Sequence, residues 1–186
     1  IDEGANETYN LTVGGVAAVG TITDDDNAPT ISSVSSNSAT EASAIVHTVT
    51  LSNASNVATS YALSLVDISA TGGGTDYTSV LTNAAFSNGV TISGGTITVP
   101  ANVTSFTVSV PTTADSIDEV NETYTLNVGG ASGTGTINDD DGAPTITSVT
   151  SDTQVEGTNL VHTVTLSNAS SSSTSFAYTQ GGGSGT

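Results

Sequence analysis

Apolar and polar residues alternate with a period of two along most of this chain. The clearest run is 45–51, in which Ile45, His47, Val49 and Leu51 fall on one face and threonine or valine on the other. Such alternation, rich in β-branched residues, is typical of half-buried antiparallel strands, and no stretch has the 3.6-residue period of an amphipathic helix. The same alternation returns at 61–65, 106–110 and 124–128.

The alternating segments are short and are separated by turn sequences such as "ATGGGT" and "SNGV". This spacing predicts an all-β fold, an immunoglobulin-like antiparallel sandwich of two sheets. The strands expected in one copy of the fold lie at 30–35, 45–53, 59–67, 79–86, 95–99, 104–111, 121–128 and 133–138.

The sequence repeats itself with an offset of 115 residues, as the distance from residue 6 to residue 121 shows. We therefore expect tandem repeats: the C-terminal part of one copy in 1–28, a complete copy in 29–143 and the N-terminal part of a third in 144–186. Near-identical tandem copies usually provide length or avidity rather than chemistry. The matching segments are NETYNLTVGG (6–15) with NETYTLNVGG (121–130), TITDDDNAPTI (21–31) with TINDDDGAPTI (136–146), and IVHTVTLSNAS (45–55) with LVHTVTLSNAS (160–170).

The charge of the chain restricts its partners. The 186 residues contain no lysine or arginine and 18 aspartates and glutamates, which gives a formal charge of −18. Nucleic acids and anionic membranes need basic side chains on their partners, so neither is expected to bind. Cysteine is absent, and no apolar run is long enough to cross a membrane. Compensation for the acids must come from dissolved cations or from a basic partner.

Most acids are predicted to lie at strand ends or in loops. In an antiparallel sandwich, the loop before the strand at 121–128 and the end of the strand at 133–138 can share one pole, which would bring Asp115, Asp118, Glu119 and the triplet 139–141 together. Two carboxylates 4 Å apart repel by roughly 4 kcal/mol at an effective dielectric near 20. Hard oxygen ligands without cysteine select Ca²⁺ over zinc or copper, and Mg²⁺ fits less well because it demands strict octahedral geometry. The alternative is that the acids form a solvated surface that keeps the chain soluble.

Several motifs, in this order, resemble the Calx-β domain family, whose members occur in sodium–calcium exchangers and in bacterial adhesins. An acid precedes the second strand in "TEASAIVHTVTLS", a small residue precedes Asp-Tyr in "GTDYTS", and a strand pair reads "GTITVPANVTSFTVSV". An acidic loop leads into a strand in "DSIDEVNETYTL", and "TINDDD" closes the copy.

The resemblance implies a Ca²⁺ cluster at one pole of each copy, close to the start of the next copy. Pro29 and Pro144 follow the aspartate triplets and stiffen this joint. Bound ions would then fix the angle between consecutive copies. The ligands that the resemblance implies in the complete copy are Glu41, Asp76, Asp115, Asp118, Glu119, Glu122, Asp139, Asp140 and Asp141, and those in the partial copies are Asp2, Glu3, Glu7, Asp24, Asp25, Asp26 and Glu156.

Other chemical signals are weak. "DDDG" lacks the alternating acids of an EF-hand, and "GGGTDY" does not recur every nine residues as a calcium β-roll requires, so it is interpreted as a glycine turn. His47 and His162 occupy equivalent inward positions and are expected to be packed structural residues. Because no nucleophile is paired with a general base, we expect no enzymatic activity.

These observations favour a Ca²⁺-stabilised stalk segment of a long, secreted bacterial surface adhesin, with neighbouring repeats of the same or adjacent chains as its partners. The ligand of the complete adhesin is not defined by this sequence. An alternative is the protomer of an extracellular filament or surface layer, in which strand edges are completed by neighbouring chains. Direct glycan binding ranks last, because few aromatic side chains are present for sugar stacking.

Overall fold

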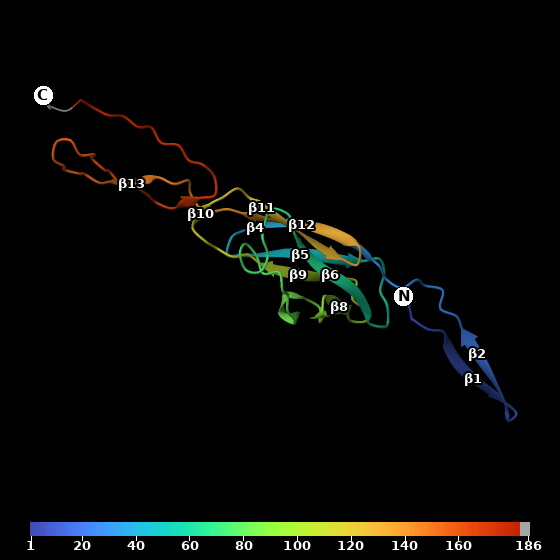
Figure 1. The fold of residues 1–186 in the computed structure, drawn as a ribbon. Coiled ribbons are helices and arrows are strands. Elements are labelled where there is room, and N and C mark those ends of the chain that lie inside the picture. Colours follow the sequence, from blue (N-terminus) through green and yellow to red (C-terminus); the bar gives the residue numbers. More distant parts are fainter. Residues whose placement is uncertain (183–186) are drawn as a thin grey trace. The chain divides into compact units, whose positions relative to one another are not determined.

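The computed structural model describes residues 1–182 (Figure 1). Within this range the fold is all-β: strands are joined by turns, and one short 3₁₀ helix is the only helical element. No helix in the described part of the chain has the length and apolarity needed to cross a membrane. The chain divides into two compact units: a first unit of residues 1–114 and 121–138, and a second unit of residues 115–120 together with the chain from Asp139 onward.

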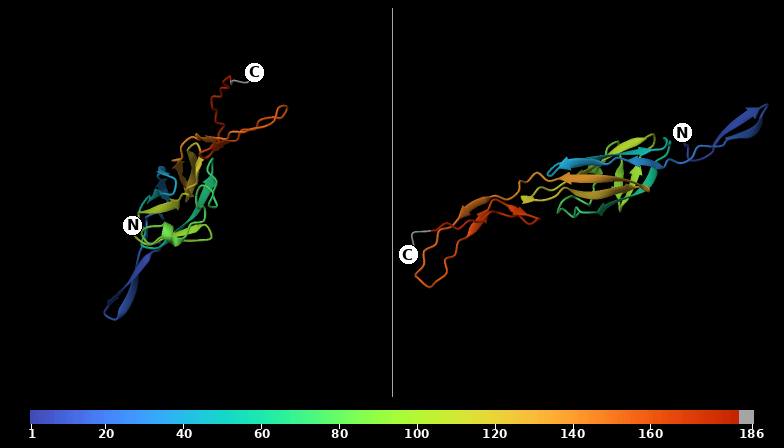
Figure 2. Two further views of the ribbon diagram at one scale, coloured as in Figure 1. Left: turned by 90° about the vertical axis from the view of Figure 1, so that its left-hand side faces the viewer. Right: turned by 90° about the horizontal axis from the view of Figure 1, so that it is seen from above.

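Two sheets form the body of the first unit, and Figure 2 shows their strands gathered together. A three-stranded antiparallel sheet has the order β3-β5-β9, and a six-stranded sheet has the order β4-β12-β11-β6-β8-β7, in which only the β4–β12 pair is parallel. The strands are β3 (Ile31–Val34), β4 (Asn37–Thr40), β5 (Ala44–Leu51), β6 (Thr59–Asp67), β7 (Thr91–Ser93), β8 (Thr96–Val99), β9 (Ser105–Pro111), β11 (Glu122–Val128) and β12 (Ala131–Asn138).

The two sheets share a single hydrophobic core. Ile45 and Val49 of β5 are completely buried, as are Leu126 and Val128 of β11 in the other sheet. Burial alternates along both strands, so the period-two pattern of the sequence marks the inward face as predicted.

The first unit also contains the antiparallel hairpin of β1 (Glu7–Val13) and β2 (Val16–Ile22). Its sequence repeats that of β11 and β12, and so does its register: Tyr9 lies opposite Gly20, as Tyr124 lies opposite Gly135. In both pairs the tyrosine ring covers the glycine so closely that any side chain at the glycine would collide with it.

The second unit contains two small strand pairs. β10 (Ile117–Asp118) pairs in parallel with β15 (Ala169–Ser170), and β13 (Ile146–Val149) pairs antiparallel with β14 (Val164–Leu166). β13 and β14 correspond in sequence to β3 and β5 of the complete copy.

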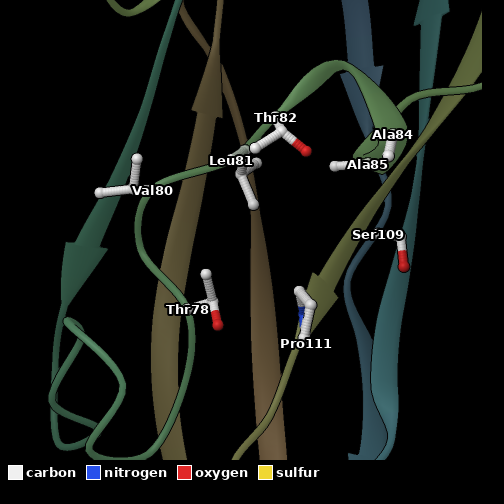
Figure 3. A pocket seen from close by; sticks show the side chains of 8 residues that line it. All are labelled: Thr78, Val80, Leu81, Thr82, Ala84, Ala85, Ser109 and Pro111. Carbon is white, nitrogen blue, oxygen red and sulfur yellow. The ribbon is translucent and has the colours of Figure 1, made fainter.

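The strand predicted at 79–86 is wrong. This segment instead forms a loop with a 3₁₀ turn (Asn83–Ala85) that lies along β9, as Figure 3 shows, and only Phe86 makes a bridge, to Val108. The Asn83 side chain explains the difference, because its Oδ1 accepts a hydrogen bond from the amide of Ile92 (2.8 Å) and so ties the turn to β7. The pocket beside it, about 240 Å³, is lined by aliphatic groups and hydroxyls and offers no titratable side chain.

A buried polar chain crosses the core of the first unit. His47 is fully buried; its Nδ1 donates to the carbonyl of Ser35 (2.7 Å), and its Nε2 lies 2.9 Å from the Tyr124 hydroxyl. The Tyr124 ring stacks on Tyr77 with 4.5 Å between centroids, and the Tyr77 hydroxyl donates to Asp67. His47 is therefore a packed structural histidine, as predicted, and burial lowers its pKa despite the bond to Ser35.

Candidate metal centre

A cluster of carboxylates lies beside the β1–β2 hairpin in the first unit. Glu3, Asp24 and Asp26 each present one carboxylate oxygen such that all three atoms lie within 4.8 Å of one another. Glu7 and Asp25 line the same hollow, of about 270 Å³. The structure thus gathers five of the sequence-predicted ligands of the N-terminal partial copy around one space.

Hydrogen bonds hold this cluster in place. Asp24 Oδ1 accepts a hydrogen bond from the amide of Asp26 (3.2 Å), and its own amide donates to Asn6 Oδ1 (3.1 Å). The bond from the Asp26 amide lowers the pKa of Asp24. Desolvation, followed by the hydrogen bond and charge of Asp24, raises the pKa of Glu3. The ionised form of Asp24 is therefore favoured and that of Glu3 is disfavoured, as expected where carboxylates lie close together.

In the second unit, hydrogen bonds connect the acidic loop at 115–120 with the second aspartate triplet, 139–141. Asp139 accepts two hydrogen bonds, from the amide of Glu119 to Oδ2 (3.1 Å) and from the amide of Asp141 to Oδ1 (3.4 Å). The second bond repeats the Asp26–Asp24 contact of the first unit. Asp115 Oδ1 accepts a hydrogen bond from the amide of Ile117 (2.8 Å), which stabilises the turn of this loop.

The environment of Asp141 disfavours its ionised form. Its Oδ2 atom is buried without a hydrogen-bond partner among the described residues. Desolvation raises its pKa, and the charges of Asp139, Asp140, Asp115 and Asp118 raise it further. This oxygen is therefore shielded from water and lies among like charges, which is an unfavourable environment for an ionised carboxylate.

A serine in each unit binds an aspartate of the acidic loop, and sequence reasoning missed this contact. Ser55 Oγ donates to Asp2 Oδ2 (2.8 Å), and Ser170 Oγ donates to Asp118 Oδ2 (2.7 Å). The backbones also pair in parallel in both units, as an isolated bridge between Asp2 and Ser55 and as the β10–β15 pair between Asp118 and Ser170. The two serines are 115 residues apart, so the same contact is formed at equivalent places in two copies.

A second link accompanies each serine. Asn53 Nδ2 donates to the carbonyl of Asn27 (2.9 Å), and Asn168 Nδ2 donates to the carbonyl of Gly142 (2.8 Å). Asn27 and Gly142 directly follow the aspartate triplets, so each triplet is tied to the "SNAS" turn of the copy that comes next. The repeated "SNAS" at fixed offset was the signal that could have revealed the joint from sequence.

The remaining predicted ligands lie on several elements. Glu41 is in the β4–β5 turn, where its amide donates to the carbonyl of Asn138 (3.2 Å), and Glu156 is at the equivalent turn of the second unit. Asp76 closes the glycine turn by accepting the amide of Thr71, and Glu122 is the first residue of β11.

The chain matches no protein-family model and no curated protein sequence. The structure therefore supports an all-β fold with carboxylate groups that can hold a metal ion, and the identity of the ion and its purpose are matters of proposal.

Proposed function

We propose that this chain is a Ca²⁺-stabilised structural repeat of a long, secreted bacterial surface adhesin, similar to Calx-β domains, in which the ions fix the joint between consecutive copies. The observation that carries the proposal is that the carboxylates gather at the place where one copy contacts the next. The "DDD" triplet that gathers carboxylates is the same segment that is tied, through Asn27 or Gly142, to the start of the following copy.

The recurrence of the joint supports a mechanical role. Each contact of Asp2 with Ser55 has its counterpart between Asp118 and Ser170, within 0.1 Å for the side-chain bond. Because the same residues form this contact in both copies, we infer that it is a regular feature of the repeat. In tandem arrays, nearest-neighbour contacts of this kind determine the stability of the whole.

The donor set supports Ca²⁺ as the ion. All groups of the two clusters are carboxylate oxygens, which suit hard cations, and flexible loops suit Ca²⁺ better than the rigid octahedron of Mg²⁺. In the first cluster Glu3, Asp24 and Asp26 would hold the ion, and in the second Asp139 and Asp141. A bound dication would offset the desolvation and the neighbouring negative charges that raise the pKa of Glu3 and of Asp141.

Thermal unfolding of the full chain in chelator and in 10 mM CaCl₂ tests the proposal. For sites with Kd of about 10⁻⁴ to 10⁻³ M, as in extracellular modules, this concentration adds about 1.4 to 2.7 kcal/mol per site and raises Tm by several degrees. MgCl₂ at equal ionic strength should give a smaller increase.

Matched variants locate the effect. Asp24→Asn and Asp139→Asn should each reduce the Ca²⁺-dependent increment in Tm. Asp152→Asn removes the same charge at a residue that accepts the amides of Thr153 and Val161, and should leave the increment unchanged. A Tm that is equal in Ca²⁺ and in chelator would overturn the proposal.

A further inference from the structure

Six asparagines of the chain occur in the sequence Asn-x-Ser/Thr, which is the acceptor sequence (sequon) for N-linked sugars. The side-chain amide nitrogen, Nδ2, takes the sugar, and the residue two positions later carries a hydroxyl group. Because the chain is rich in serine and threonine, some matches arise by chance, and the environment of each amide has to be compared. The six are Asn6, Asn10, Asn53, Asn102, Asn121 and Asn168.

Two of the six amides already use both of their protons. Asn53 Nδ2 donates to the carbonyls of Asn27 (2.9 Å) and Ala54 (3.3 Å). Asn168 Nδ2 makes the equivalent two bonds, at 2.8 and 3.2 Å. A sugar on Nδ2 takes the place of one amide proton and so removes one of these bonds. Both amides are therefore structural groups and are poor acceptors in the folded chain.

Two further sequons lie among acids. Asn6 and Asn121 are each followed directly by a glutamate. Asn6 Oδ1 accepts a hydrogen bond from the amide of Asp24 (3.1 Å), and Asn121 Nδ2 donates to Asn138 Oδ1 (3.1 Å). The activated donors of sugars carry a diphosphate leaving group, and carboxylates beside the acceptor repel this negative charge.

The sequon at Asn10 lies within a strand. Asn10 is paired with Val19 and Thr12 with Ala17 in the β1–β2 hairpin. A transferase has to bind the backbone of the acceptor in its own cleft, and part of the backbone of this sequon is already paired with the neighbouring strand. This sequon is therefore less accessible than one in a turn.

The sequon at Asn102 lies in the turn of residues 100–104, which connects β8 to β9. Val103 packs against the core, whereas Asn102 and Thr104, the acceptor and the hydroxyl residue, are both exposed. Within residues 1–182, neither of these two side chains has a hydrogen-bond partner. The amide nitrogen and the hydroxyl group that a transferase must reach are thus both accessible.

The backbone of this turn suits an asparagine and does not occupy its side chain. Asn102 has a φ of 64°, in the left-handed region that asparagine tolerates better than most residues with a side chain. Its backbone amide donates to the carbonyl of Ser55 (2.7 Å). The sequence has no acid between residues 77 and 114, and Asp2, which contacts Ser55, is only 5% exposed. An anionic donor therefore meets less repulsion here than at the acid clusters.

We propose that Asn102 is the glycosylation site of the folded chain and that its substrate is a sugar activated as a diphosphate. In the transfer, Asn102 Nδ2 bonds to the anomeric carbon of the sugar while the bond from that carbon to the diphosphate oxygen breaks. The diphosphate leaves with the electron pair, and one amide proton passes to a base of the transferase. The bulky, hydrated sugar displaces no side-chain hydrogen bond of Asn102. The site does not depend on whether the acid clusters bind Ca²⁺.

Transfer of glucose to the folded, full-length chain tests the proposal. The chain is incubated with UDP-glucose and a purified asparagine glucosyltransferase that requires only Asn-x-Ser/Thr. A protease that cuts before aspartate then releases residues 76–114, in which Asn102 is the single sequon. Mass spectrometry should find one hexose on this fragment and none on the fragments that contain the other five sequons.

Short peptides that span each of the six sequons control for the sequence preference of the enzyme. The rate of transfer to each asparagine of the chain is compared with the rate on its peptide; the two should be similar at Asn102, and transfer to the chain should be lost at the other five. A chain that stays unmodified at Asn102 while the Asn102 peptide is modified would overturn the proposal. Transfer to Asn53 or Asn121 of the chain as fast as to Asn102 would also overturn it.

Variants of the turn separate loss of the acceptor from loss of the fold, which circular dichroism checks. Asn102→Gln moves the amide, and Thr104→Ala removes the hydroxyl while leaving Asn102 in place; both should abolish the hexose on residues 76–114. Thr104→Ser keeps the hydroxyl and should retain transfer. If the left-handed φ makes Asn102→Gln unfold, the Thr104 pair still decides the outcome. A Thr104→Ala chain modified as fast as the unaltered chain would contradict the assignment.

Discussion

The β11–β12 pair and the β1–β2 hairpin have nearly the same sequence and opposite environments. Both have the same register, and both pack a tyrosine over a glycine. Leu126 is completely buried, yet Leu11 is 55% exposed. The comparison separates two levels of structure: the hairpin register is determined locally by residues across the turn, whereas burial requires strands that are distant in sequence.

The largest predicted difference concerns the paired leucines. Leu126→Ala removes a buried side chain from the core and should lower the free energy of unfolding by about 2 to 5 kcal/mol. Leu11→Ala alters an exposed site and should change it by less than about 0.5 kcal/mol. Urea denaturation at low micromolar concentration, in Ca²⁺, measures both. Equal effects would mean that the hairpin is also packed in solution.

The paired tyrosines should differ next. Tyr124→Phe leaves His47 Nε2 without its hydroxyl partner in the core and should cost about 1 to 3 kcal/mol. Tyr9→Phe should be neutral in the monomer, since its ring is exposed. The same urea titration checks the pair, and a neutral Tyr124→Phe would show that the buried polar chain adds no stability.

The pH dependence should separate the two histidines. Burial lowers the pKa of His47 in the folded state, so the unfolded chain binds its proton more readily. The contribution of neutral His47 to the free energy of unfolding is complete above the pKa of the unfolded chain, about 6.5. It decreases as the pH falls toward the lower pKa of the folded state, by at most about 1.4 kcal/mol per pH unit.

His47→Gln should remove this acid-dependent loss, and His162→Gln should leave it in place. Unfolding measured in urea between pH 7 and pH 5 gives the slope for each variant. If the His162→Gln chain lost the slope instead, the assignment of the buried histidine would be wrong.

The smallest predicted effects are at the joint, and they should be alike in the two copies. Ser55→Ala and Ser170→Ala each remove a hydrogen bond to an aspartate carboxylate and should weaken the local structure by about 1 kcal/mol. Ser60→Ala, at an exposed strand position, serves as the control. Hydrogen exchange of the amides of Asn56 and Ser171, which donate to the carbonyls of Asp2 and Asp118, should increase in the corresponding variant. If Ser55→Ala and Ser170→Ala had unequal effects, the serine–aspartate contact would not be a common feature of the repeats.

Much of the fold could be predicted from the sequence, because alternation marks strands whose side chains enter a core. The strands at 45–51, 59–67 and 122–128 follow this rule. β4 and β7 were not predicted. Asn37–Thr40 has no apolar alternation, since it is held by parallel backbone pairing to β12, and Thr91–Ser93 is only three residues long.

The candidate site was predicted only in part. Carboxylates that are adjacent in sequence, such as the triplets, remain neighbours in any fold, so their clustering could be anticipated. The serine contacts join residues 52 or 53 positions apart, and the bond from Tyr77 to Asp67 depends on how the glycine turn folds. Asp67, which the sequence did not assign to the metal site, thus accepts a structural hydrogen bond from Tyr77.

The most direct test of the central claim is an experimental electron-density map from crystals grown in CaCl₂, with anomalous data collected to identify calcium. We predict an anomalous peak with oxygen ligands at about 2.3 to 2.6 Å among Glu3, Asp24 and Asp26, and a second peak beside Asp139 and Asp141. Density that shows these carboxylates surrounded by water alone, at a Ca²⁺ concentration of 10 mM, would contradict it.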